Sequence, residues 1–144
     1  MNRITTRCRR GSALVAALVL AASTAAHAEA SLYNSSGEAT VYIADNQTIY
    51  TWDGEPVAYL TSGSVYGFNG EHLGWVSQGM VIDHDGNTPC AVREALGSMP
   101  VMESLKSLKS LEPLKALREL APLKPLATRR WSDEACEVFM KKGV

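Results

Sequence analysis

The sequence predicts an all-β fold: four sequential β-hairpins in a closed four-fold arrangement, with a leucine-rich tail and a short terminal helix behind them. A short unit recurs four times in residues 31–92, strand-like apolar runs flank each copy, and each copy turns on a glycine. These glycines are Gly37, Gly54, Gly70 and Gly86. Because a lone hairpin is marginal in water, we expect the four to share one apolar centre and to close on themselves, leaving few free strand edges.

Residues 1–28 have the features of a secretory signal peptide. An arginine-rich start precedes an uncharged stretch at 11–26, and Ala26-His27-Ala28 has the small-x-small form of a cleavage site. We therefore expect cleavage before Glu29 and a secreted or periplasmic protein. A single membrane anchor is the alternative, although the apolar stretch is short for a span. The Arg9-Arg10 pair leaves a twin-arginine export route open.

Two cysteines, Cys90 and Cys136, remain once this segment is removed. In an exported chain such a pair indicates a disulfide, which would tie the end of the hairpin region to the C-terminal segment. Two free thiols are the alternative, because the sequence does not give the separation of the two Cα atoms.

The four units carry the residues that tight hairpins require. Asp53-Gly54 and Asn69-Gly70 predict two-residue type I′ turns, in which both central residues have positive φ. The segments between units, such as 61–64 and 77–79, are small and polar and are expected to be links. Aromatic side chains recur along the strands and are expected to supply most of the buried area: Tyr33, Tyr42, Tyr50, Trp52, Tyr59, Tyr66, Phe68 and Trp75.

One pattern runs through the units: Tyr-x-x-Asp/Asn-Gly, then Gly/Ala-Tyr/Trp, closest at 49–60, 65–76 and 79–87. Its most telling strings are His72-Leu73-Gly74-Trp75 and Asp83-His84-Asp85-Gly86-Asn87. In this pattern residues 31–92 resemble the bacterial 4-fold beta flower proteins, which also often have a Pro-Leu-Lys tail. The resemblance implies a fold and no established activity. The first unit departs from the pattern at Ser36-Gly37 and is expected to be a capping copy.

The tail at residues 93–130 has a different period from the hairpins. Between residues 96 and 126 a Leu or Met stands at every third position, which fits the three residues per turn of polyproline II rather than an α-helix. As polyproline II, residues 105–126 would reach about 65 Å at ~3.1 Å per residue, enough to wrap a small domain. Residues 31–92 hold seven acidic side chains and no Lys or Arg, whereas the tail is basic.

Three interpretations of this tail compete. It wraps the acidic core and completes the core's hydrophobic cover, or residues 105–130 form a basic arm that docks on an anionic surface or another cell-envelope partner. The third is a broken amphipathic helix at 101–121. Residues 131–142 predict a short helix, with Ser132 as its N-cap and Lys141-Lys142 at its end.

The candidate metal ligands are His72, Asp83, His84 and Asp85. The two histidines lie in equivalent units beside turn glycines, and with Asp53 or Asp85 they would suit zinc if the units meet near the symmetry axis. Residues 83–87 resemble part of a calcium loop, whose twelfth position would be Glu94. The alternative is an ordinary turn that caps its own backbone, with surface histidines beside it.

Trp52, Tyr59 and Trp75 are candidates for a sugar- or peptide-binding face, although aromatic side chains at strand spacing are more often core. The sequence has no nucleophile elbow, phosphate loop or metalloprotease helix, so we expect no catalytic residue and no cofactor. Acidic hairpins speak against nucleic acid. The expected function is an exported, non-enzymatic structural or interaction module. A metal-dependent hydrolase or metal-binding protein that uses the Asp and His turn residues is the alternative.

Overall fold

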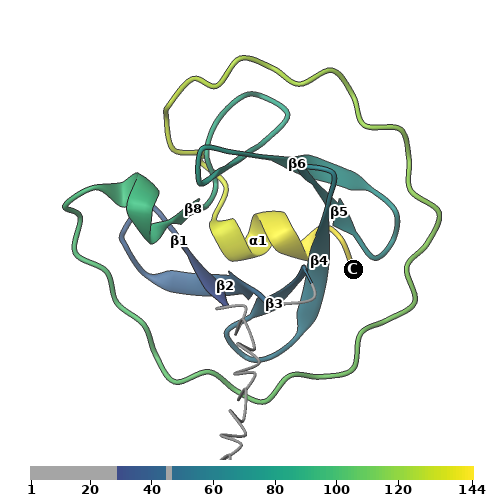
Figure 1. Ribbon diagram of the computed structural model, residues 1–144, viewed down its shortest axis with the longest axis horizontal. Helices are drawn as coiled ribbons and strands as arrows, with labels where there is room; N and C mark the ends of the chain where they lie inside the picture. The colour runs from purple at the N-terminus through teal and green to yellow at the C-terminus, as the bar shows by residue number, and fades with distance from the viewer. Residues whose placement is uncertain (1–28, 45–46) are drawn as a thin grey trace, which may run out of the picture.

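The structure is a computed structural model that describes residues 29–44 and 47–144; the predicted signal peptide lies outside the described residues. Eight antiparallel strands close into one barrel in sequence order (Figure 1). The strands are β1 (Ala30–Tyr33), β2 (Ala39–Ile43), β3 (Thr48–Thr51), β4 (Pro56–Thr61), β5 (Ser64–Gly67), β6 (His72–Ser77), β7 (Met80–Ile82) and β8 (Ala91–Val92). β8 closes the barrel by pairing with β1. The predicted closed all-β fold of four hairpins is confirmed.

The inside of the barrel is aliphatic. One residue from each strand, or from just before it, builds this core: Leu32, Val41, Ile49, Val57, Val65, Leu73, Val81 and Cys90. An eight-stranded barrel is just wide enough for side chains to fill it. All the recurring aromatic side chains except the half-buried Trp52 are buried, and most of them lie in two clusters outside this core, one around Tyr42 and one around Tyr59. Aromatic side chains are thus buried as expected, but on the outer face of the strands, and the centre that the four hairpins share is aliphatic.

The predicted type I′ turns occur at the other end of the hairpins from where we expected them. At Asp53-Gly54 only the glycine has positive φ (84°), and the strand register shifts beside the turn, as in a three-residue hairpin with a bulge. Ser62-Gly63 and Gln78-Gly79 instead have positive φ at both residues. The presumed links are therefore the two-residue hairpin turns, and the Asp-Gly and Asn-Gly turns each carry one extra residue.

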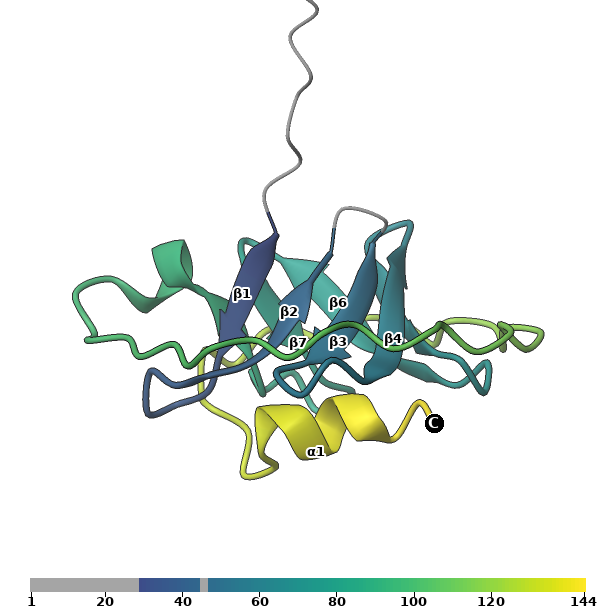
Figure 2. The ribbon, with the colours of Figure 1, turned by 90° about the horizontal axis from the view of Figure 1, so that it is seen from below.

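The short C-terminal helix α1 (Cys136–Lys141) lies across one end of the barrel (Figure 2). Its buried side chains, Cys136, Phe139 and Met140, join the aliphatic core. The helix is shorter than the predicted 131–142, and its N-cap is Ala135, which makes no side-chain cap bond. Ser132 is not the cap; its Oγ accepts a hydrogen bond from the Glu134 N–H at 3.3 Å. Helix α1 therefore closes this end of the barrel.

A 3₁₀ turn, η1 (Arg93–Leu96), leads from β8 into residues 98–132, which we call the strap. The strap runs once around the outside of the barrel before the chain enters α1 (Figures 1 and 2). It has no helix at 101–121, the third interpretation of the tail, and touches the sheet through isolated bridges at Met102 and Trp131. Over the residues that the structure describes, no helix is long and apolar enough to cross a membrane.

Candidate interaction surface

The strap is hydrogen-bonded to all four hairpins, and one of these bonds recurs at every turn glycine. At each turn glycine a strap N–H donates to the glycine carbonyl oxygen at 2.8–2.9 Å. The pairs are Met102 to Gly37, Ser110 to Gly54, Glu119 to Gly70 and Thr128 to Gly86. The strap donors are thus eight or nine residues apart, while the turn glycines are sixteen or seventeen apart. The strap therefore advances eight or nine residues for each hairpin of sixteen or seventeen, and it makes the same contact at four equivalent turns.

The turn glycines also make room for the strap. A Cβ added at Gly54 would lie 2.0 Å from the Leu108 carbonyl oxygen, and one at Gly70 would lie 2.1 Å from that of Leu117. A Cβ added at Gly37 would lie 2.1 Å from the Pro100 carbonyl oxygen, and one at Gly86 would lie 2.3 Å from that of Leu126. A side chain at any of these four positions would therefore displace the strap as well as strain the turn.

Four cations that each follow a leucine in the strap turn towards the barrel: Lys106, Lys109, Lys115 and Arg118. The Lys106 ammonium lies 4.3 Å from the centre of the Tyr42 ring, and that of Lys115 lies 4.5 Å from the Tyr59 ring. Such contacts are attractive because the ring face carries negative charge. The outer face of the aromatic clusters is thus covered by basic side chains of the strap.

The three aromatic candidates for ligand binding lie in different clusters. Trp52 packs edge-on against Tyr42, and its Nε1 donates to the Ser104 carbonyl oxygen at 2.9 Å. Tyr59 is buried beneath Lys115. Trp75 is buried, with its ring 4.6 Å from that of His72. The structure does not bring the three together on one face, and ligand binding by each stays a prediction.

The strap leucines point away from the barrel. Eight of them are 93–96% exposed and form what we call the leucine belt: Leu105, Leu108, Leu111, Leu114, Leu117, Leu120, Leu123 and Leu126. The expectation that these leucines complete the core's hydrophobic cover is therefore wrong. The backbone and the other two positions of each triplet make the contacts with the barrel, so the leucine side chains are left outside.

The candidate metal ligands line a cleft of about 340 Å³ beside α1. The cleft is acidic, with Glu71, Asp83, Asp85, Asp133 and Glu134 in its wall together with His72, His84 and Lys142. Asp83 behaves as a turn residue, because its Oδ1 accepts hydrogen bonds from the Asp85 and Asn87 N–H groups at 3.0 and 2.8 Å. Among residues 29–44 and 47–144, no group of three or more His, Cys, Asp or Glu side chains is arranged to hold a metal ion.

His72 and His84 are brought together by β6 and the turn after β7. His72 Nδ1 lies 2.9 Å from His84 Nε2, and the two rings are stacked with centres 5.2 Å apart. Burial, and then the neighbouring His84, lowers the pKa of His72. His72 Nε2 is buried and has no hydrogen-bond partner within the described residues. The pair therefore favours a neutral His72 ring.

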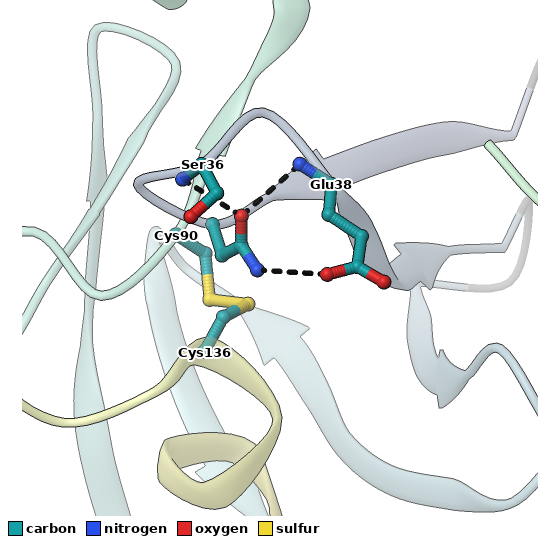
Figure 3. The surroundings of a disulfide bond; sticks show 5 residues. Ser36, Glu38, Cys90 and Cys136 are labelled. Atoms are coloured by element: carbon teal, nitrogen blue, oxygen red, sulfur yellow. Dashed lines mark hydrogen bonds between the residues drawn. A yellow bond between two sulfur atoms is a disulfide. The ribbon is translucent and has the colours of Figure 1, made fainter. Parts of the chain in front are cut away.

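Cys90 and Cys136 form a disulfide, with Cα atoms 5.1 Å apart. The bond joins the first residue of α1 to the chain just before β8, close to the first hairpin turn, where Ser36 and Glu38 lie (Figure 3). Both cysteines are at most 1% exposed. The disulfide therefore fastens the helix to the end of the barrel that it covers.

The model of the family described as "4-fold beta flower protein" matches residues 30–140. The chain belongs to this family. The match spans the barrel, the strap and most of α1, so the flower includes the segment that encircles it as well as the hairpins at 31–92. The beta flower family is not a known enzyme family. No curated protein and no solved structure gives a significant match to this flower.

Sequence reasoning missed the side chains by which the strap is positioned in the flower. Glu112 accepts hydrogen bonds from Thr48 Oγ1 at 2.9 Å and from the Tyr50 hydroxyl at 3.0 Å. Glu119 accepts the His72 N–H through its carboxylate and the Tyr66 hydroxyl through its carbonyl oxygen. The sequence did contain a signal for these contacts, because Glu112 and Glu119 are acidic residues within an otherwise basic tail.

Proposed function

We propose that this chain is an exported, non-enzymatic interaction module whose binding surface is the leucine belt. The observation that carries the proposal is the exposure of eight leucines, each 93–96% accessible, in one unbroken series. Scattered exposed leucines are ordinary, but a contiguous apolar surface of this extent on a folded domain is typical of an interaction site.

Export rests on the signal-like sequence of residues 1–28 and is supported by the disulfide. A disulfide persists in the periplasm or outside the cell and is rare in the reducing cytosol. A partner in the cell envelope would therefore be within reach of the belt.

The proposal is tested by removing the belt without touching the barrel. Leu117, Leu123 and Leu126 are replaced together by Ser in the chain from Glu29 onward. We expect unchanged thermal unfolding, because these side chains are at least 93% exposed, and loss of retention in a cell-envelope fraction. Val138→Ser is the control, since Val138 is 56% exposed on α1 and away from the belt. A large fall in stability of the triple variant would make the leucines structural and refute the proposal.

A metal-dependent hydrolase or metal-binding protein is the second candidate, and the contact between His72 and His84 in an acidic cleft is the observation that favours it. Zinc or calcium would then raise the melting temperature of the purified chain, and His84→Ala would remove the rise. Equal melting curves with and without either ion would exclude this candidate.

A further inference from the structure

The leucine belt does not present the same surface all the way around the barrel. Its leucines are equally exposed, but the cations beside them differ. Over the first arc, residues 105–111, Lys106 and Lys109 both form salt bridges with Glu29. Over the next arc, residues 114–119, Lys115 lies on the Tyr59 ring and Arg118 donates to Thr61 Oγ1 at 3.0 Å. These positive charges are engaged by the protein itself.

The last arc, residues 120–130, carries cations that are free. Lys124, Arg129 and Arg130 are exposed, and their side chains have no ion pair, hydrogen bond or ring contact in the described part of the chain. Of the two carboxylates that follow in sequence, Glu134 is held by Lys142 at 2.6 Å, which leaves Asp133. Positive charge therefore exceeds negative charge on this arc.

The same arc carries the last three leucines of the belt, Leu120, Leu123 and Leu126, each at least 93% exposed. Apolar side chains next to unpaired cations suit a lipid bilayer, in which acyl chains lie beneath negatively charged headgroups. Hydrophobic insertion and attraction to anionic headgroups then add, as they do for peripheral membrane anchors.

We propose that residues 120–130 dock on an anionic lipid membrane, with the three leucines among the acyl chains and the three cations at the headgroups. The inference rests on the proposed function, in which the belt is the binding surface, and adds which arc binds and what it binds. The strap that carries the belt curves around the barrel (Figure 1), so a flat membrane meets one arc at a time.

A second copy of the chain fits this arc less well than a membrane does. Two copies that met through it would set three cations against three cations, and like charges oppose association. Three leucines per side also fall well short of the roughly 800 Å² per partner that a stable protein interface buries. Membrane binding has no such threshold, because each inserted side chain contributes on its own.

The test is co-sedimentation of the chain from Glu29 onward, which contains the whole barrel, strap and helix, with vesicles of phosphatidylcholine alone or mixed with phosphatidylglycerol. We expect binding to the anionic vesicles only. Leu123→Ser with Leu126→Ser should weaken it at least about tenfold, since each buried leucine contributes more than one order of magnitude when fully inserted. The matched control is Leu108→Ser with Leu111→Ser, from the arc with engaged cations, and should change binding less than about twofold.

A second variant separates charge from insertion. Lys124→Gln with Arg129→Gln should weaken binding to anionic vesicles about fivefold per cation, and most of this loss should vanish in high salt. Equal effects of the two leucine pairs, equal binding to both vesicle types, or no binding at all would overturn the inference. If the vesicles are not bound but the belt variant still leaves the envelope fraction, the proposed function stands and only the membrane assignment fails. Self-association in sedimentation velocity that either leucine pair abolishes would assign the belt to a second copy instead.

Discussion

Replacing Gly70 by Ala tests whether the strap is held at the turns in the way the structure shows. Gly70 has a φ of 88°, and a Cβ there would lie 2.1 Å from the Leu117 carbonyl oxygen. Gly63 is a matched position, because its φ is 77° but nothing lies within 4 Å of the added Cβ. Left-handed alanine should cost about 1–2 kcal/mol at either site. The difference between the two variants therefore isolates the clash with the strap.

The size of that difference follows from the hydrogen bonds near Gly70. A strap pushed outward by the new Cβ loses the bond from the Glu119 N–H to the Gly70 oxygen (2.9 Å) and strains the one from the Ala116 N–H to the Phe68 oxygen (2.8 Å). At about 1 kcal/mol each, Gly70→Ala should cost about 2 kcal/mol more than Gly63→Ala.

Urea unfolding measures this difference, and limited proteolysis of the native state should find new cleavage in residues 114–121 of the Gly70 variant alone. Equal unfolding free energies for the two variants, with no change in proteolysis, would refute the reasoning, because the strap would then not press on the turn.

Three further predictions concern the disulfide, the buried histidine and a strap hydrogen bond. Cys136→Ser should lower the free energy of unfolding by about 4 kcal/mol, the loop entropy expected for a sequence separation of 46 residues, as measured in urea without reductant. Burial lowers the pKa of His72, so the unfolded chain binds a proton that the native ring does not. Stability should therefore be complete above the unfolded pKa of about 6.5 and fall as the pH drops through it, and melting curves of His72→Gln should lose part of this slope. Tyr66→Phe, which removes a 3.1 Å hydrogen bond to the Glu119 carbonyl oxygen, should cost about 1 kcal/mol by urea unfolding.

Much of the barrel can be predicted from the spacing of glycines and apolar runs. The repeat indicates eight strands, and the lack of any other cover for their edges favours closure. Spacing alone does not say which Xaa-Gly pair forms which turn, and residue preference favours Asp53-Gly54 over Ser62-Gly63 for the type I′ turn, the reverse of what the structure has. The strand register decides, because a bulge at the Asp53 turn leaves only its glycine in the left-handed region.

The candidate site was harder to predict than the fold. A leucine at every third position indicates one apolar face of an extended strap but not whether that face meets the barrel. Burial of leucine is the ordinary expectation. In this chain the aromatic outer face of the barrel is covered instead by Lys106, Lys115 and Arg118, which lie over the rings of Tyr42, Tyr59 and Tyr66. These partners are far apart in the sequence, so the contacts become visible only in the folded structure.

The period of the strap and the identity of its leucines therefore have different origins. Ring closure sets the spacing of the strap contacts, because eight or nine extended residues per quarter turn, roughly 25–28 Å at ~3.1 Å per residue, bring a strap N–H to each turn glycine. Nothing in the ring requires leucine at the outward position, where a side chain such as Leu111 is 96% exposed and any polar residue would fit. A polar residue there would also keep the domain more soluble. The eight leucines thus have no packing role in the described barrel, and the binding surface that we propose for the belt would give them one.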